Sequence, residues 1–346
     1  MEKIRHILDG RRLTSVLVVA VGLWCGGSLA EAPALQTATC PASLDWESAA
    51  EIGRGMKYIH LTLTEPRLME NYLVRIDLHT PGLRVTSSGR ASNWGDPMPD
   101  YTNSVILIDV KRQRTREFLQ EHRTHGTNMV LALNTSPWGP WCPPFTHAYG
   151  RFASLTVSDG RRVSRSERRN GMLVIYTNNV AVITNELDDA RIPSVAIAHP
   201  GHGAGIILKG GQPLAPSNPK SRAWSDLAPR TAFGISADGR WLYGVVVDGR
   251  QPGYSLGADM YDLVRILKAA GAADAINMDG GGSATLVWWD EQKKLPVVTA
   301  NALTGAKWNV TLNGAAVPSG YTGTATVRDG VVYASVARGG THIIFR

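Results

Sequence analysis

The chain has 346 residues, of which 43% are hydrophobic and 19% charged. This fits one large globular domain or two smaller ones and excludes a disordered or collagen-like chain, although 36 residues are glycine. The formal net charge is +7, and the basic excess is spread along the chain apart from a short cluster at residues 161–169. Such an excess is compatible with an anionic ligand, but no recognition motif indicates nucleic acid.

The N-terminus has the pattern of an export signal. Residues 1–12 contain four basic side chains, and residues 13–30 form an uncharged stretch with an apolar centre. Because Ser28-Leu29-Ala30 fits a small-x-small cleavage site, we expect residues 1–30 to be a signal peptide, with Glu31 first in a secreted or periplasmic protein. The alternative is an uncleaved anchor, but this stretch is at the short limit for spanning a bilayer. We expect no stable membrane insertion after cleavage.

Two cysteines remain after the predicted cleavage, Cys40 and Cys142. In an oxidising compartment they can form one disulfide, or they can be two unrelated thiols. The sequence leaves both possibilities open.

The domain organisation follows from where periodic patterns begin. Residues 31–55 show little periodicity, which predicts an N-terminal leader segment that packs late or stays loose. No repeat or low-complexity linker divides residues 56–346, so we expect one catalytic domain with its core at residues 105–290. The expected fold class is α/β, in the mixed α+β sense, with a central, largely mixed β-sheet, helices and β-hairpins.

The elements of the first half are predicted from local patterns. Alternation of apolar and polar residues predicts strands over 58–63 and 72–78, and a buried strand is expected over 130–133, ending at Asn134. A polar helix is expected over 115–125. Turn dipeptides predict two hairpins, around Asp159-Gly160 and Asn178-Asn179.

A loop with four prolines and two tryptophans follows Asn134, over residues 135–150. A rigid aromatic loop suits the wall of a ligand cleft. It equally suits a surface loop that folds over its own hydrophobic residues.

The second half of the sequence contains most of the candidate functional residues. Strands are predicted over 230–235 and 241–247, joined at Asp238-Gly239. Ser255 is the expected N-cap of a helix that runs to Ala270, where Gly271 ends it, and a buried strand follows over 275–278.

Two aspartates, Asp248 and Asp279, directly follow apolar strands that a helix separates. A strand–helix–strand crossover favours parallel neighbouring strands. Parallel neighbours place both carboxylates at one edge of the sheet, where open α/β sheets bind ligands.

Three glycines, Gly280–Gly282, follow Asp279. A dinucleotide fingerprint is excluded because a strand rather than a helix follows, and a nucleotide P-loop is excluded because the Gly-Lys-Ser/Thr ending is absent. A purely structural turn remains the alternative. The neighbouring Asn277 and Ser283, with the two aspartates, favour a ligand site.

His199 and His202 form a close histidine pair. A metal site needs a third ligand, which the sequence does not indicate, so we predict no metal site and assign no cofactor.

Three motifs in this order and spacing resemble the signature of the phosphodiester glycosidase family. They are Arg230-Thr231-Ala232-Phe233-Gly234-Ile235, Val247-Asp248-Gly249-Arg250 and Asn277-Met278-Asp279-Gly280-Gly281-Gly282-Ser283. The resemblance spans residues 105–290 and includes the strand end at Asn134. It implies a hydrolase that cleaves the anomeric C–O bond of a sugar phosphodiester, with that diester or another phosphate-containing glycan as its partner.

The resemblance, read with the chemistry of the side chains, suggests roles for these residues. Asp248 and Asp279 are the candidates for acid, base or nucleophile, and Arg230 for holding the anionic diester. The remaining candidates bind substrate, through phosphate oxygens or sugar hydroxyls: Asn134, Thr231, Gly249, Asn277, Gly280, Gly281, Gly282 and Ser283. Which aspartate has which role, and whether the reaction inverts or retains, stays open.

Two other classes of function remain. A non-catalytic envelope protein that binds polysaccharide would use the same loop and glycines without needing both aspartates. A phosphatase-like metalloenzyme would need a metal site.

Overall fold

The computed structural model describes residues 38–99, 106–140, 148–188, 190–201 and 205–301, and five strands between residues 311 and 344. The predicted signal peptide, Cys142 and His202 lie outside the described residues. The chain divides into two compact units, one of residues Leu35–Thr304 and one that combines Met1–Ala34 with Gly305–Arg346. The expected single domain over 56–346 therefore extends past the unit boundary at residue 304.

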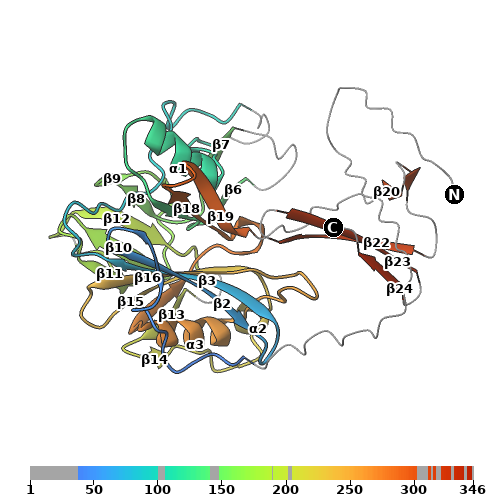
Figure 1. Ribbon diagram of the computed structural model, residues 1–346. Helices are drawn as coiled ribbons and strands as arrows, with labels where there is room; N and C mark the ends of the chain where they lie inside the picture. The colour runs from blue at the N-terminus through green and yellow to red at the C-terminus, as the bar shows by residue number, and fades with distance from the viewer. Residues whose placement is uncertain are drawn as a thin grey trace. The chain divides into compact units, whose positions relative to one another are not determined.

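An eight-stranded sheet forms the centre of the Leu35–Thr304 unit (Figure 1). Each of its strand pairs is antiparallel. In spatial order the strands are β1 (Ala50–Gly53), β2 (Met56–Leu63), β3 (Met69–Asp77), β16 (Trp241–Val247), β15 (Arg230–Ile235), β17 (Asp274–Asn277), β13 (Ile206–Lys209) and β14 (Gln212–Pro213).

Helix α3 (Met260–Ala270) covers one face of this sheet (Figure 1). Its apolar side packs on alternate strand residues such as Leu73, Val245 and Ala232. Burial of these side chains is the main stabilising contribution on this face, since apolar area removed from water contributes about 25 cal/mol per Å².

Two smaller antiparallel sheets cover the opposite face. The intervening residues of the same strands, among them Val74, Leu242 and Val246, point to this side because side chains alternate along a strand. One sheet comprises β11 (Ala181–Thr184), β10 (Met172–Tyr176), β12 (Pro193–Ala198), β8 (Thr156–Ser158) and β9 (Arg161–Arg162), and the other β19 (Leu295–Asn301), β18 (Thr285–Asp290) and β5 (Leu131–Leu133).

The remaining elements are short. The Leu35–Thr304 unit also contains α1 (Thr115–Thr124), α2 (Arg222–Ser225), a 3₁₀ turn (Gly281–Ser283), β4 (Val110–Lys111), β6 (Trp138–Gly139) and β7 (Tyr149–Phe152). The strands of the other unit are β20 (Thr311–Leu312), β21 (Ala315–Ala316), β22 (Tyr321–Arg328), β23 (Val331–Arg338) and β24 (Thr341–Ile344). Among the described residues, no helix has the length and apolar character needed to cross a membrane.

The expected fold class needs correction. Strand residues far outnumber helical ones, and the described strand pairings are antiparallel rather than mixed. The prediction that β16 and β17 are parallel neighbours is wrong, because β15 lies between them and pairs with both. The tight hairpin at Asp238-Gly239 fixes β15 beside β16, so the chain leaving α3 reaches only the free edge of β15.

Two boundaries also differ from the sequence prediction. Residues 38–55 do not form a loose segment: the indole of Trp46 is buried against α3 and donates a hydrogen bond to the Ala270 carbonyl (2.9 Å). Helix α3 begins at Met260 rather than after Ser255, because Asp259 is its N-cap and Asp262 completes the capping box.

Candidate active site

The two predicted aspartates lie at the same edge of the central sheet. Strands β16 and β17 run in the same direction because each is antiparallel to β15. Asp248 directly follows β16, and Asp279 follows β17 by two residues. One strand therefore separates the two strand ends, a spacing of about 10 Å between strand axes.

Asp248 lies on the sheet face opposite α3, next to a set of polar side chains that we call the tyrosine–carboxylate cluster. Its members are Asp248, His60, Thr62, Glu70, Tyr72 and Tyr254. The Tyr254 hydroxyl donates to Asp248 Oδ2 (3.5 Å) and lies 2.6 Å from the Tyr72 hydroxyl. Glu70 Oε2 is 2.7 Å from both His60 Nε2 and Thr62 Oγ1. The rings of His60 and Tyr72 stack at 4.6 Å.

The electrostatics of Asp248 follow from this setting. Only 4% of the residue is exposed, and its Oδ1 is buried with no hydrogen-bond partner among the described residues. Burial raises the pKa of Asp248 to about 6; a hydrogen bond from Tyr72 opposes the rise, and the charge of Glu70 adds to it. Asp248 thus changes charge near pH 6.

Two hydrogen bonds hold the backbone of Asp279 in place. Its N–H donates to the Thr135 carbonyl (2.8 Å), and its carbonyl accepts from Asn134 Nδ2 (2.7 Å). Burial raises the pKa of the Asp279 carboxyl, while hydrogen bonds from the Ser283 side chain and the Gly280 amide oppose that rise. Ser283, predicted to bind substrate, therefore contacts a predicted catalytic residue.

Asn134 and Thr231 contact each other rather than an open space. Asn134 Oδ1 accepts from Thr231 Oγ1 (2.6 Å) and from the Thr285 amide (2.9 Å), and its Nδ2 bonds to Asp279. Thr231 is fully buried. These contacts favour a structural role for both side chains, in which they fix the ends of β5, β15 and β18 around Asp279, over the predicted contact with sugar.

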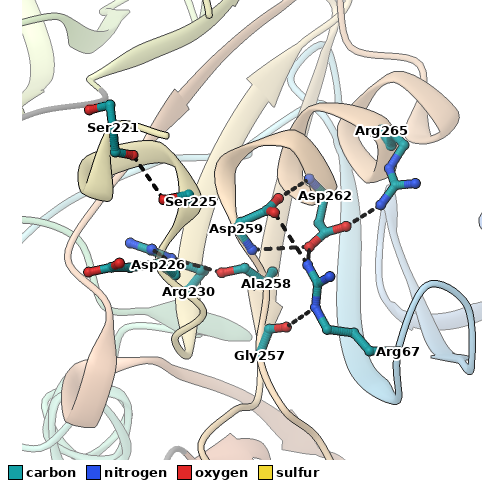
Figure 2. Close-up of polar contacts among 10 residues, drawn as sticks. All are labelled: Arg67, Ser221, Ser225, Asp226, Arg230, Gly257, Ala258, Asp259, Asp262 and Arg265. Atoms are coloured by element: carbon teal, nitrogen blue, oxygen red, sulfur yellow. Dashed lines mark hydrogen bonds and ion pairs between the residues drawn. The ribbon is translucent and has the colours of Figure 1, made fainter. Parts of the chain in front are cut away.

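Arg230 begins β15 at the same sheet edge. Its Nε donates to the Ala258 carbonyl (3.1 Å) and its Nη2 to the Asp226 carbonyl (2.6 Å), just before α3 (Figure 2). Burial, and next the charge of Arg250, lower the pKa of the Arg230 guanidinium. The charges of these two arginines therefore repel each other, an arrangement that a bound anion would stabilise.

The glycines at this edge are required mainly by close packing. A Cβ on Gly249 would lie 2.7 Å from both Gly257 Cα and the Pro229 nitrogen, and a Cβ on Gly280 2.5 Å from the Pro229 carbonyl oxygen. The Gly281 amide donates to that same carbonyl (2.9 Å), so it is not directed at a ligand as predicted. Of the three amides after Asp279, only that of Gly282 has no partner within the described part of the chain.

Asn277 is directed to the other side of the sheet from Asp248. It pairs with Ala232, whose side chain packs in the core under α3, and only 5% of Asn277 is exposed. A direct contact with sugar is therefore not favoured for Asn277.

Metal ligands do not gather in the described parts of the chain, where no group of three or more His, Cys, Asp or Glu side chains could hold an ion. His199 is buried, and its Nδ1 accepts a hydrogen bond from the Gly201 amide (3.4 Å). Cys40 is half-buried and forms no disulfide with another described residue; whether it pairs with Cys142, which the sequence leaves open, lies outside the described residues.

Several residues of the site were not predicted. His60, Glu70, Tyr72 and Tyr254 come from elements whose proximity to Asp248 is set by strand pairing, with Tyr72 opposite Val246. Arg250 stands inside the second motif, and the Cβ of a side chain at Gly281 would lie 3.5 Å from its Nη1. The signal that was available is the alternation over 58–63, which places His60 and Thr62 on one face.

Comparison with known proteins agrees with the motifs. The model of the phosphodiester glycosidase family matches residues 145–333, more than half of the chain. The chain therefore belongs to the phosphodiester glycosidase family, a family of hydrolases.

Similar solved structures are distant. The zebrafish N-acetylglucosamine-1-phosphodiester alpha-N-acetylglucosaminidase catalytic domain, auto-inhibited by its pro-peptide, is 19% identical, with a TM-score of 0.46 over 73% of this chain and 77% of that one. A hypothetical protein from Synechocystis is 12% identical, with a TM-score of 0.40 over 67% of this chain and 57% of that one. No curated protein matches at a significant level.

Proposed function

We propose that the protein hydrolyses the anomeric C–O bond of a sugar phosphodiester. The observation that carries the proposal is the buried Asp248 carboxyl, with a pKa of about 6, at the sheet edge that also holds Arg230. A carboxyl that titrates near the working pH is well suited to proton transfer. The family match supports the reaction class.

The two arginines at this edge suit the leaving group. Arg230 is anchored to the backbone, and the charge of Arg250 acts on it. A phosphodiester placed between them would receive charge-assisted hydrogen bonds from planar guanidinium groups. The Gly282 amide, directly after the glycine whose Cβ would lie 3.5 Å from Arg250 Nη1, offers a further donor.

The aspartates would act on the sugar. In the proposed step, water attacks the anomeric carbon and gives its proton to the Asp248 carboxylate. The C–O bond breaks, and its electron pair leaves with the phosphate oxygen. Asp279 stabilises the positive charge that develops at the anomeric carbon. The departing phosphate monoester is a weak base, with a second pKa of about 6, so it needs little help from an acid.

A release assay in H₂¹⁸O tests this proposal. Sugar-1-phosphodiesters of several sugars are incubated with the protein, with and without a chelator, and both products are analysed by mass spectrometry. We expect ¹⁸O in the free sugar and none in the phosphate monoester, with no effect of the chelator. Label in the phosphate would show that the P–O bond is cleaved and identify a phosphodiesterase instead. Loss of activity with chelator would show that the reaction needs a metal ion. Binding of polysaccharide without any release would favour the non-catalytic function.

We also propose that the protein acts outside the cytoplasm. This rests on the sequence pattern of residues 1–30. Intact-mass analysis of exported protein is expected to show a chain that begins at Glu31. A mass that includes Met1–Ala30 would contradict cleavage.

A further inference from the structure

Two tyrosine hydroxyls meet at the buried Asp248 carboxylate from separate parts of the chain. Tyr72 lies on β3, and Tyr254 lies in the loop between β16 and α3. Their hydroxyl oxygens are 2.6 Å apart, and that of Tyr254 is 3.5 Å from Asp248 Oδ2. The chemistry proposed above does not use either residue.

The Tyr72 hydroxyl remains protonated next to this carboxylate. Burial, and then the negative charge of Asp248, raise the pKa of the Tyr72 hydroxyl far above its ordinary value. Hydrogen bonds from Tyr72 and Tyr254 stabilise the ionised form of Asp248 against burial. Oδ1 is buried and has no partner among the described residues, so the hydrogen bond from Tyr254 reaches the carboxylate at Oδ2.

The loop that carries Tyr254 is fixed at both ends. The Ser255 hydroxyl donates to the Asp248 carbonyl (2.6 Å) and accepts from the Glu70 amide (3.1 Å). The Leu256 amide donates to the Leu68 carbonyl (2.9 Å). The residue after Tyr254 is thereby attached to the backbone of Asp248, whose side chain Tyr254 contacts, and this gives the Tyr254 hydroxyl a defined position.

The other charged groups facing Asp248 are held away from it. Glu70 directs its carboxylate to His60 and Thr62 (2.7 Å each), and the His60 ring stacks on Tyr72. The groups that act on the charge of Asp248 are therefore Glu70, His60, Tyr72 and Tyr254. Of these, Tyr254 donates a hydrogen bond to Asp248 Oδ2, and the Tyr72 hydroxyl lies within hydrogen-bond distance of the Tyr254 hydroxyl.

We propose that Tyr72 and Tyr254 are positioning residues that hold the Asp248 carboxylate in one orientation and favour its ionised form. The part that Asp248 plays in catalysis rests on the proposed function. The orientation and protonation of its carboxylate are independent of that function.

The test replaces each tyrosine by phenylalanine and reads Asp248 in two ways. The first is a ¹³C-carboxyl NMR titration of aspartate-labelled protein, assigned with Asp248→Asn. Loss of one hydrogen bond to a charged group is expected to move the Asp248 titration upward by about one pH unit in Tyr254→Phe and in Tyr72→Phe. Tyr261→Phe, on α3 beside Trp224, is the matched control and is expected to leave the titration unchanged.

The second reading is kinetic. Tyr254→Phe is expected to lower kcat about tenfold with little change in KM, and to move the acidic limb of the kcat–pH profile in the direction of the NMR titration. Because Tyr72 is buried in the sheet, thermal unfolding is measured for both variants, and Tyr254→Phe decides the question if Tyr72→Phe does not fold. An unchanged Asp248 titration in a folded Tyr254→Phe protein overturns the proposal. A shifted titration in a protein that hydrolyses no sugar phosphodiester supports the positioning and overturns the proposed function alone.

Discussion

The backbone N–H of Asp248 donates a hydrogen bond to the carbonyl of Glu70 (3.1 Å). This bond continues the β16–β3 pairing past the end of β16 and places an acidic residue from the start of β3 beside the candidate catalytic aspartate. The charge of Glu70 contributes to the raised pKa of Asp248, whereas burial, Ser283 and Gly280 govern the pKa of Asp279. The carboxylate that is electrostatically coupled to Asp248 is thus Glu70, a residue from a distant part of the sequence.

The raised pKa of Asp248 predicts how stability depends on pH. The folded-state pKa of about 6 lies above the value of an unfolded aspartate, so the folded protein binds this proton more tightly between pH 4 and 6. The free energy of unfolding therefore falls through this window as pH rises, by up to about 3 kcal/mol from this one group.

Asp248→Asn removes this dependence. Relative to the unmodified protein, the variant is expected to gain about 1–3 kcal/mol of unfolding free energy between pH 4 and pH 7, while losing about 10²- to 10⁴-fold in rate. Urea unfolding of both proteins at pH 4, 5 and 7 provides the measurement. If the unfolding free energies of the two proteins differed by the same amount at all three pH values, the folded state would not raise the pKa of Asp248, and its charge would not be buried.

Asp279→Asn tests the second carboxylate. The variant keeps the backbone bonds to Asn134 and Thr135, so the fold is expected to survive while turnover falls about 10²-fold or more. Asp274→Asn is the matched control, because Asp274 begins the same strand and pairs with Lys209 at the other end (2.7 Å). Near-normal turnover in Asp279→Asn would leave this residue a structural role, and Glu70 would become the second carboxylate to examine.

Local patterns predicted much of the fold because the forces that fix its hairpins are local. The Asp159-Gly160 and Asn178-Asn179 turns adopt the positive φ values that such dipeptides favour, at Asp159, Gly160 and Asn179, and the strands beside them are formed. The order of strands was not predictable in this way. Insertion of β15 between β16 and β17 depends on which sheet edge is free after the hairpin forms, a long-range property.

Part of the candidate site was likewise predictable from local sequence patterns. Asp248 and Asp279 follow strands that run in one direction, so their common edge could be predicted even with the wrong neighbour. Ser255 was misread as a helix cap because its hydroxyl was free to bond elsewhere: it contacts the Asp248 carbonyl and the Glu70 amide. Tyr72 and Glu70 reach the site through β3, far away in sequence.

The close packing at Gly249 predicts a large effect from one methyl group. A Cβ there would lie 2.7 Å from backbone atoms of Gly257 and Pro229, which cannot rotate away. Gly249→Ala is expected to cost about 3 kcal/mol of unfolding free energy and to displace Asp248. Gly253→Ala in the same loop meets no atom within 4 Å and carries only the strain of its φ of +82°, so about 1 kcal/mol is expected. Thermal and urea unfolding compare the two, and an equal effect would contradict the packing argument.

The two arginines predict the choice of substrate. A phosphate monoester leaves readily, whereas an alcohol is far more basic and needs a strong acid to protonate it. The positive charges of Arg230 and Arg250 would stabilise a phosphate leaving group, but they would not protonate an alcohol. We expect the unmodified protein to have a kcat/KM at least about 10²-fold higher for a glycosyl phosphodiester than for an alkyl glycoside of the same sugar.

Arg230→Ala and Arg250→Ala should each narrow this ratio of kcat/KM values about tenfold or more, mainly by raising KM for the diester. Arg54→Ala, in the turn between β1 and β2, removes an equal charge away from this sheet edge and should leave the ratio unchanged. Equal kcat/KM for the two substrates in the unmodified protein would indicate an ordinary glycosidase, in which the arginines hold the fold rather than the phosphate.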